Sequence, residues 1–246
     1  MTILVTRPEP AASELVARLR TQGKLAWILP LIEFTPGRDI VHLPQQLAAL
    51  QPGDLVFLLS QQVVTFAHPE LQRQGFAWPT QLDYYAIGRS TALALHTVSN
   101  LKVDYPHARE TSEELVRLNR LQQVSGKRAL ILRGSPGREL LADTLTERGV
   151  DVRYAECYQR CEKAYDGATE GRRWRDRGIT TLVVTSGEML QQLFALFPPI
   201  DRREWLLHCR LVVVSERLAT LAASLGWQDI DVADGADNDA LLRALR

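Results

Sequence analysis

Hydroxyl, arginine and glycine residues recur directly after the short apolar runs of this chain. In a parallel α/β sheet such runs end at one edge, where helix N-termini present backbone N–H groups to anions. The residues at these ends therefore predict an anion-binding site. No Ser-His-Asp order, HExxH pair, Walker loop or complete GxGxxG accompanies them. The candidates are Arg7, Ser60, Gln61, Arg89, Ser90, Arg133, Gly134, Ser135, Ser186, Gly187, Ser215, Glu216 and Arg217.

Other kinds of site fit the sequence less well. The loop from Gly134 to Gly137 follows an apolar run as a dinucleotide loop would, but it lacks the third glycine and the acidic residue after the next strand. A phosphorelay receiver domain would have acidic residues at the strand ends, where this chain has arginine and serine. The histidines are scattered, and we interpret them as structural or surface residues: His42, His68, His96, His107 and His208.

The elements that carry the candidate residues occur twice in the chain. Residues 3–34 align with residues 129–160 without a gap at a shift of 126 positions, which places Arg7 on Arg133. Each segment has an apolar run, a polar turn, a stretch with helical spacing, a glycine and a second apolar run, which is typical of a β-α-β unit. Later strand-helix units repeat as well, with Ser60 on Ser186 at the same shift. Nearly the whole chain is therefore a duplication.

The order of the repeated units allows two arrangements. Either two tandem domains meet near Ser125, or a central segment forms a permuted copy inserted between the terminal segments. Periodicity alone does not choose between them. The second apolar runs, residues 27–34 and 150–160, are long enough to leave their sheets and pair as a two-stranded link, which favours the insertion. Five apolar runs per half, alternating with helices, predict an open doubly wound α/β sheet in each half.

The insertion implies a division of the chain into two domains. We expect a discontinuous domain 1, residues 1–36 plus 166–246, and an inserted domain 2, residues 37–165. We interpret the polar segment 162–176 as the second crossing between them. Pro69 is expected to limit the helix after Ser60, and Thr111 is expected to cap a helix of its own.

The composition excludes several classes of partner. Lys plus Arg and Asp plus Glu number 29 each in 246 residues, so no global field favours nucleic acid or an anionic membrane. The opening run MTILVTRPEP lacks the basic head and apolar core of a signal peptide, and no run approaches membrane-spanning length. Cys157, Cys161 and Cys209 show no zinc spacing, which predicts reduced thiols in a cytoplasmic protein.

Several motifs resemble those of one family. The TRP turn at residues 6–8, the LLS and VVTSGE strand ends at Ser60 and Ser186, the AIGRSTA turn at residues 86–92 and the RYAECYQR run with Tyr158 are similar to uroporphyrinogen-III synthases. The resemblance covers essentially the full length. It implies two flavodoxin-like doubly wound parallel-sheet domains, one inserted in the other, joined by a two-stranded β-ladder with the active site in the cleft.

The resemblance also implies a reaction. The linear tetrapyrrole hydroxymethylbilane loses water and is cyclised with inversion of ring D to uroporphyrinogen III, in haem and sirohaem biosynthesis. The enzyme would be a hydro-lyase without cofactor or metal. The expected protein is a cytoplasmic monomer whose partners are this small molecule and, transiently, the preceding enzyme of the pathway.

Individual residues take their expected roles from the family. Tyr158 matches the tyrosine that assists departure of the hydroxyl, where a neutral phenol can donate a proton. Its alternative role is to pack between the domains as part of the ladder. Ser186 matches a family hydroxyl at a strand end but would serve equally as a helix N-cap. Arg7 and Arg133 either bind carboxylates of the substrate or brace their turns.

One turn departs from the family pattern. Many members have Gly-x-Thr-Thr where this chain has Ser215 to Leu218, so the hydroxyl pair is missing and Arg217 could substitute as a donor. The matching turn from Gly88 to Thr91 keeps its hydroxyls. A non-catalytic two-lobed protein that binds small anions is the alternative function, although such receptors are normally exported.

Overall fold

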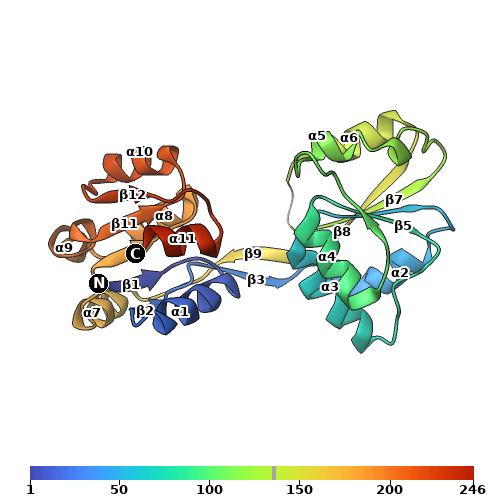
Figure 1. Ribbon diagram of the computed structural model, residues 1–246. Helices are drawn as coiled ribbons and strands as arrows, with labels where there is room; N and C mark the ends of the chain where they lie inside the picture. Colours follow the sequence, from blue (N-terminus) through green and yellow to red (C-terminus); the bar gives the residue numbers. More distant parts are fainter. Residues whose placement is uncertain (135–136) are drawn as a thin grey trace. The chain divides into compact units, whose positions relative to one another are not determined.

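The computed structural model describes residues 1–134 and 137–246, which form two compact units (Figure 1). Unit 1 comprises Met1–Glu33 and Cys161–Arg246, and unit 2 is the segment between them, Phe34–Arg160. The arrangement is therefore the inserted one and not the tandem one. Both junctions fall inside strands that link the units, so the expected boundaries after residues 36 and 165 stay a prediction.

Unit 1 contains a five-stranded parallel sheet in the order β12-β11-β10-β1-β2. Strand β1 lies between β10 and β2: Ile3 pairs with Thr181 of β10, and Leu4 pairs with Trp27 of β2. The two terminal segments of the chain thus build one sheet. Its strands are β1 (Thr2–Val5), β2 (Leu25–Ile28), β10 (Thr181–Val183), β11 (Arg210–Val213) and β12 (Ile230–Val232).

Helices cover both faces of this sheet because its inner strands are apolar on both sides. Side chains of α1 and α11 pack with Ile3 and Val5 on one face, and side chains of α7, α8 and α10 pack with Leu4 on the other. All three strand residues are fully buried, and each contributes roughly 1.5–3 kcal/mol relative to an exposed side chain. The helices of unit 1 are α1 (Ala11–Thr21), α7 (Gly167–Asp176), α8 (Gly187–Leu196), α9 (Pro199–Glu204), α10 (Glu216–Leu225), α11 (Asn238–Ala244) and the 3-10 turn η3 (Leu206–His208).

Unit 2 repeats this architecture with the strand order β6-β5-β4-β7-β8, again parallel. The central strand β4 packs Leu55 and Phe57 against α5 and α6, and Val56 and Leu58 against α2, α3 and α4. The expected doubly wound α/β fold is confirmed in both halves. The elements of unit 2 are β4 (Leu55–Leu58), β5 (Asp83–Ala86), β6 (Val103–Asp104), β7 (Arg128–Arg133), β8 (Asp151–Glu156), α2 (Leu43–Ala48), α3 (Gln61–Arg73), α4 (Arg89–Ser99), α5 (Ser112–Leu115), α6 (Leu140–Glu147) and the 3-10 turns η1 (Ile40–His42) and η2 (Asn119–Leu121).

The units are linked by a two-stranded antiparallel ladder of β3 (Ile32–Pro36) and β9 (Tyr158–Glu162). The N–H of Lys163 donates to the carbonyl of Leu31 at 2.9 Å, and the N–H of Gly37 donates to the carbonyl of Cys157 at 3.0 Å. Each of the two long runs expected from the sequence is therefore a pair of strands. In the second run, Cys157 makes the transition, because its N–H still bonds Arg133 of the sheet at 2.8 Å while its carbonyl bonds the ladder.

Two local expectations are wrong. Helix α3 continues past Pro69 to Arg73, because Pro69 is exposed and the fully buried Leu71 beyond it offsets the missing hydrogen bond. Most of the expected crossing segment forms α7, whose N-cap Asp166 accepts from the backbone of Thr169 at 3.2 Å. Thr111 caps α5 as expected.

Candidate functional site

The ring of Tyr158, the first residue of β9, is held by two aromatic side chains of unit 2. Phe66 of α3 is stacked on it, with centroids 6.0 Å apart and planes at 22°. Phe34 of β3 meets it edge-on, at 5.5 Å and 88°. Each such pair contributes about 0.5–1.5 kcal/mol beyond the area it buries. Packing therefore sets the position of the ring.

Gly134 at the end of β7 allows the Tyr158 ring to approach the backbone. A Cβ at this position would lie 2.6 Å from Cε2 and 2.7 Å from Cζ of the ring, far inside van der Waals contact. Only glycine leaves the required space. Its expected role as an amide donor to substrate stays a prediction, and the structure adds this steric role.

The hydroxyl of Tyr158 has a protein partner. Its oxygen lies 2.8 Å from Oγ of Ser60, and either group can donate. Ser60 occupies the N-cap position of α3, but its side chain makes no bond to that helix. Two of the predicted site residues are thus brought together, one from the end of β4 and one from β9.

Arg133 ends β7 and is held by two neighbours. Its guanidinium lies 3.6 Å from the centre of the Tyr154 ring, and Nη1 donates to Glu139 at 3.2 Å. The Tyr154 hydroxyl donates to the same carboxylate. The hydrogen bond from Tyr154, and to a lesser extent that from Arg133, holds the pKa of Glu139 below its usual value. Burial and the hydrogen bond to Glu139 raise the pKa of Tyr154 to about 12. Arg133 therefore braces its turn, and binding of a substrate carboxylate stays a prediction.

A cavity of about 330 Å³ opens beside these groups. Three arginines and one tyrosine are among the residues that line it, which favours an anionic ligand that also accepts a proton. The Arg138 side chain is 82% exposed, and its ion pair to Glu113 is long at 3.7 Å. The lining residues are Phe34, Leu59, Arg133, Gly134, Gly137, Arg138, Tyr158 and Arg160.

Sequence reasoning did not predict five of these residues as site residues: Phe34, Leu59, Gly137, Arg138 and Arg160. The strand period offered one signal, because Arg160 follows Tyr158 by two positions and so shares its side of β9. Nothing comparable marked Arg138, whose place depends on the course of a loop. Ser135, which was predicted, lies outside the described residues.

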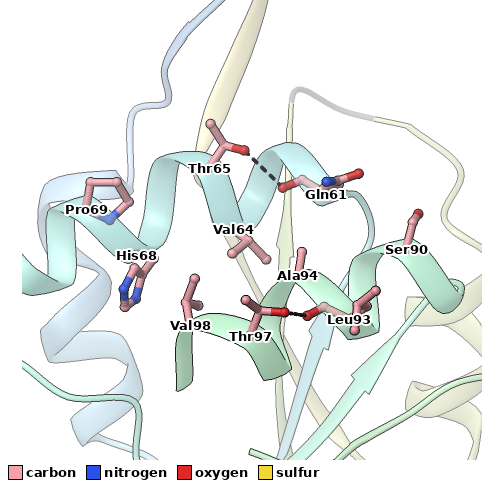
Figure 2. Close-up of a pocket in the computed structure, with 10 residues that line it drawn as sticks. All are labelled: Gln61, Val64, Thr65, His68, Pro69, Ser90, Leu93, Ala94, Thr97 and Val98. Carbon is pink, nitrogen blue, oxygen red and sulfur yellow. Dashed lines mark hydrogen bonds between the residues drawn. The ribbon is translucent and has the colours of Figure 1, made fainter. Parts of the chain in front are cut away.

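Four predicted residues of unit 2 are absent from the lining of the Tyr158 cavity: Ser60, Gln61, Arg89 and Ser90. Gln61 and Ser90 line instead a groove of about 500 Å³ between α3 and α4, together with apolar side chains such as Val64 and Leu93 (Figure 2). The N–H of Arg89 donates to the carboxylate of Glu110 at 2.9 Å. The first amide of α4 thus already has an anion of the protein as its partner.

Arg7 of unit 1 braces its turn, as one of its two expected roles requires. Its Nη1 donates to Oδ1 of Asn238 at 2.5 Å. Burial lowers the pKa of Arg7, and the nearby charge of Asp237 opposes that effect. Any contact of Arg7 with substrate stays a prediction.

The predicted serines of unit 1 act as helix caps. Ser186 accepts from the backbone N–H of Met189 at 3.2 Å, and Ser215 accepts from that of Leu218 at 3.3 Å. Gly187 is the first residue of α8, and Arg217 lies exposed in the first turn of α10. Capping does not exclude binding of substrate, so their binding roles stay predictions.

The cysteines have the expected thiol character. Cys157 and Cys209 are buried, and burial raises the pKa of each to about 12, whereas Cys161 is half-buried. Among the described residues no group of three His, Cys, Asp or Glu side chains is placed to hold a metal ion. None of the described helices is both long and apolar enough to cross a membrane.

The family follows from comparison with known proteins. A family model described as uroporphyrinogen-III synthase HemD matches residues 13–243. The chain belongs to the uroporphyrinogen-III synthase family. It is 63% identical to the uroporphyrinogen-III synthase of Escherichia coli K12 over 100% of both chains. It is 43% identical to that of Proteus mirabilis over 79% of this chain and 98% of the relative.

Solved structures of uroporphyrinogen-III synthases share the fold. A mutant enzyme from the extremely thermophilic bacterium Thermus thermophilus gives a TM-score of 0.56 at 17% identity, and the enzyme of Helicobacter pylori gives 0.56 at 19%; each comparison covers 100% of this chain and 99% of the other. At these identities the likeness shows the fold alone. Family membership confirms the expected activity, that of an enzyme in haem biosynthesis, and the alternative of a non-catalytic anion-binding protein is not supported.

Proposed function

We propose that the chain closes hydroxymethylbilane to uroporphyrinogen III with Tyr158 as the proton donor to the leaving hydroxyl. The main observation that supports this proposal is that Tyr158 lines a cavity together with Arg133, Arg138 and Arg160. The protein would act as a cofactor-independent lyase and as a cytoplasmic monomer. A transient contact with the preceding enzyme of the pathway would supply the linear substrate.

The first step requires one proton at one oxygen. The C–O bond to the leaving hydroxyl breaks, its electron pair stays on the oxygen, and the Tyr158 proton joins that oxygen so that water departs. Electrons of the pyrrole nitrogen stabilise the resulting azafulvene cation. A neutral phenol positioned at the oxygen lowers this barrier by general acid catalysis, typically ~10²–10⁴-fold.

Ring closure then restores the donor. A carbon of the terminal pyrrole ring attacks the cation, a C–C bond forms, and after rearrangement of ring D a ring proton is lost. That proton returns to the Tyr158 oxygen directly or through water. One water leaves and no electrons are gained or lost overall, so the reaction needs no redox cofactor. Most of the remaining catalysis is positioning of the two chain ends.

The arginines suit the carboxylates of this substrate. A charge-assisted hydrogen bond to a carboxylate contributes roughly 1.5–3 kcal/mol. The cavity of about 330 Å³ lies at the lower end of the ~300–1,000 Å³ range of ligand pockets, so it admits one substituted pyrrole ring and not the whole chain of four. We assign it to the ring that bears the leaving hydroxyl.

Other strand ends would bind carboxylates of the remaining rings. In unit 1 these donors are the exposed Arg217, in place of the Thr-Thr pair that many family members have, and the helix-start amides near Ser186 and Ser215. In unit 2 they are the side chains of Gln61 and Ser90.

A coupled assay tests the proposal. Purified protein supplied with hydroxymethylbilane should suppress spontaneous closure to the type I ring and yield the type III ring. Tyr158→Phe should lower kcat about 10²–10⁴-fold with little change in KM, because the phenol acts on the leaving group. Tyr105→Phe is the matched control, since Tyr105 lies outside the cavity lining, and it should keep wild-type turnover. Unchanged kcat in Tyr158→Phe would remove Tyr158 from the mechanism.

A further inference from the structure

We infer that Ser60 is a positioning residue whose hydroxyl orients the phenol of Tyr158, and that it neither caps α3 nor binds substrate. This inference rests on the proposed role of Tyr158 as proton donor. Its direct basis is the 2.8 Å separation of the two oxygens, with Ser60 at the end of β4 and Tyr158 at the start of β9.

The internal duplication supplies controls within the same chain. Ser60, Ser186 and Ser215 each stand between a buried strand and a helix, in the N-cap position. Their backbones are nearly identical, with φ and ψ of −158° and 160°, −148° and 157°, and −159° and 158°. Backbone conformation therefore does not distinguish them.

Their side chains nevertheless differ. Ser186 and Ser215 accept a bond from the third residue of their helices, at 3.2 and 3.3 Å, whereas Ser60 makes no cap bond. A missing cap usually costs a helix about 1 kcal/mol. Ser60 forgoes that bond although its backbone is set for it, because its hydroxyl bonds Tyr158 instead.

The copy of this arrangement in unit 1 has no phenol. At the shift of 126 positions that places Ser60 on Ser186, the residue matching Tyr158 is Ile32, which is 1% exposed in the apolar core. There is no phenol at the matching position, and the Ser186 hydroxyl caps α8. The use of the serine hydroxyl thus follows the presence of the tyrosine.

The direction of the bond gives it a function. Tyr158 can pass its proton to the leaving oxygen only while Ser60 donates to the phenolic oxygen. In that state the Tyr158 O–H is free of Ser60, and Ser60 stabilises the negative charge that develops on the phenolic oxygen. Hydrogen bonds to charged groups are stronger than those between neutral groups, so this contact strengthens as the reaction proceeds.

A double-mutant cycle tests the inference. Ser60→Ala should lower kcat about tenfold to a hundredfold and leave KM within about twofold, because the bond acts in the transition state. In the Tyr158→Phe background the same change should alter kcat less than about twofold, since Ser60 has no phenol to act through. Ser60→Thr keeps a hydroxyl at the position and should retain kcat within about threefold.

The controls separate this role from capping. Asp166→Ala removes the cap of α7 and should lower Tm by about 2–4 °C while leaving kcat unchanged. Wild-type kcat in Ser60→Ala would overturn the inference and leave the role of Tyr158 intact. The same holds if the fold-decrease in kcat of the double variant equals the product of the fold-decreases of the two single variants. If Tyr158→Phe itself retained full turnover, the proposed function of Tyr158 would fail first. Should Ser60→Ala not fold, a large fall in kcat for a folded Ser60→Thr would overturn the inference.

Discussion

Replacing Gly134 with alanine probes the Tyr158 site without touching any hydrogen-bonding group. The added Cβ would lie 2.6 Å from the ring of Tyr158, and ordinary contact begins near 3.4 Å, so ring or backbone must move by about 0.8 Å. The ring is confined on other sides by Phe66 and Phe34. We expect most of this displacement to carry the phenolic oxygen away from its position 2.8 Å from Ser60.

The expected effect is mainly on turnover. A misplacement of about 1 Å at a catalytic group can lower the rate about 10²-fold, so kcat of Gly134→Ala should fall by roughly that factor. Overpacking of the ring should also lower the free energy of unfolding, by about 1–3 kcal/mol. KM should change less than kcat, since the arginines around the cavity keep their charges.

Steady-state kinetics with hydroxymethylbilane and urea unfolding measure both quantities. Gly137→Ala is the matched comparison, because a Cβ there meets no atom within 4 Å although the residue lines the same cavity. Its kcat and stability should change much less than those of Gly134→Ala. If Gly134→Ala kept wild-type kcat, the position of the Tyr158 ring would not limit the reaction, and the reasoning from geometry to rate would be wrong.

Two further predictions concern titratable groups. The pKa of Glu139 is lowered by Tyr154 and Arg133, so its contribution to stability is present above the ordinary carboxyl pKa of about 4.3 and is lost as pH falls through the lower folded value. The stability difference between wild type and Glu139→Gln, measured by urea unfolding, should therefore shrink as pH falls below about 4, and a difference that grows there would contradict this assignment. Because burial raises the pKa of Cys157 and Cys209 to about 12, a thiol reagent at about pH 8 should label Cys161 first and the other two only on unfolding, whereas equal labelling rates in the native protein would refute the burial argument.

The fold was predictable because the repeated segments contain apolar runs at matching positions. Strand β4 is a run of four fully buried residues, Leu55–Leu58, and its neighbours in the sheet have the same character. Such runs are typical of parallel strands covered on both faces. The long second runs also predicted the linking ladder, since nothing in a compact five-stranded sheet requires strands of that length.

The breaks within those runs were not predictable. Cys157 separates β8 from β9 and is a residue type that a strand accommodates, so only its two backbone partners, Arg133 and Gly37, reveal the transition. The helix through Pro69 is a similar case. Propensity ends a helix at proline, but burial of Leu71 decides the outcome through tertiary packing.

The sequence predicted the chemical type of the candidate site, but it did not predict all of the residues that line it. Strand ends gave Ser60, Arg133 and Gly134, and the family resemblance gave Tyr158. Arg138 approaches the cavity from a loop. A single sequence does not specify that loop's course.

Serine at a strand end was ambiguous for a different reason. Whether the serine caps its helix or bonds a tyrosine depends on a residue distant in the chain. The local sequence around Ser60 and Ser186 therefore does not predict which bond each serine makes. Only the coordinates of both copies make the difference visible.

The two copies differ at matched positions in a sterically consistent way. At the shift of 126, Tyr158 corresponds to Ile32 and Gly134 corresponds to Pro8, while Arg133 still corresponds to Arg7. The ring needs a residue without a Cβ beside it, and proline has one. The copy with the phenol therefore has the glycine, and the copy without it does not.

This correlation bears on the role of Tyr158. A residue needed only for packing at the start of a linking strand can be aliphatic, as Ile32 is at the start of β3. At the matching position of β9, the chain instead has a phenol whose oxygen bonds Ser60 and whose ring requires Gly134. Packing alone does not explain the hydroxyl, whereas the proposed role of Tyr158 as a proton donor requires it, and the bond of Ser60 to that hydroxyl accounts for the lost helix cap.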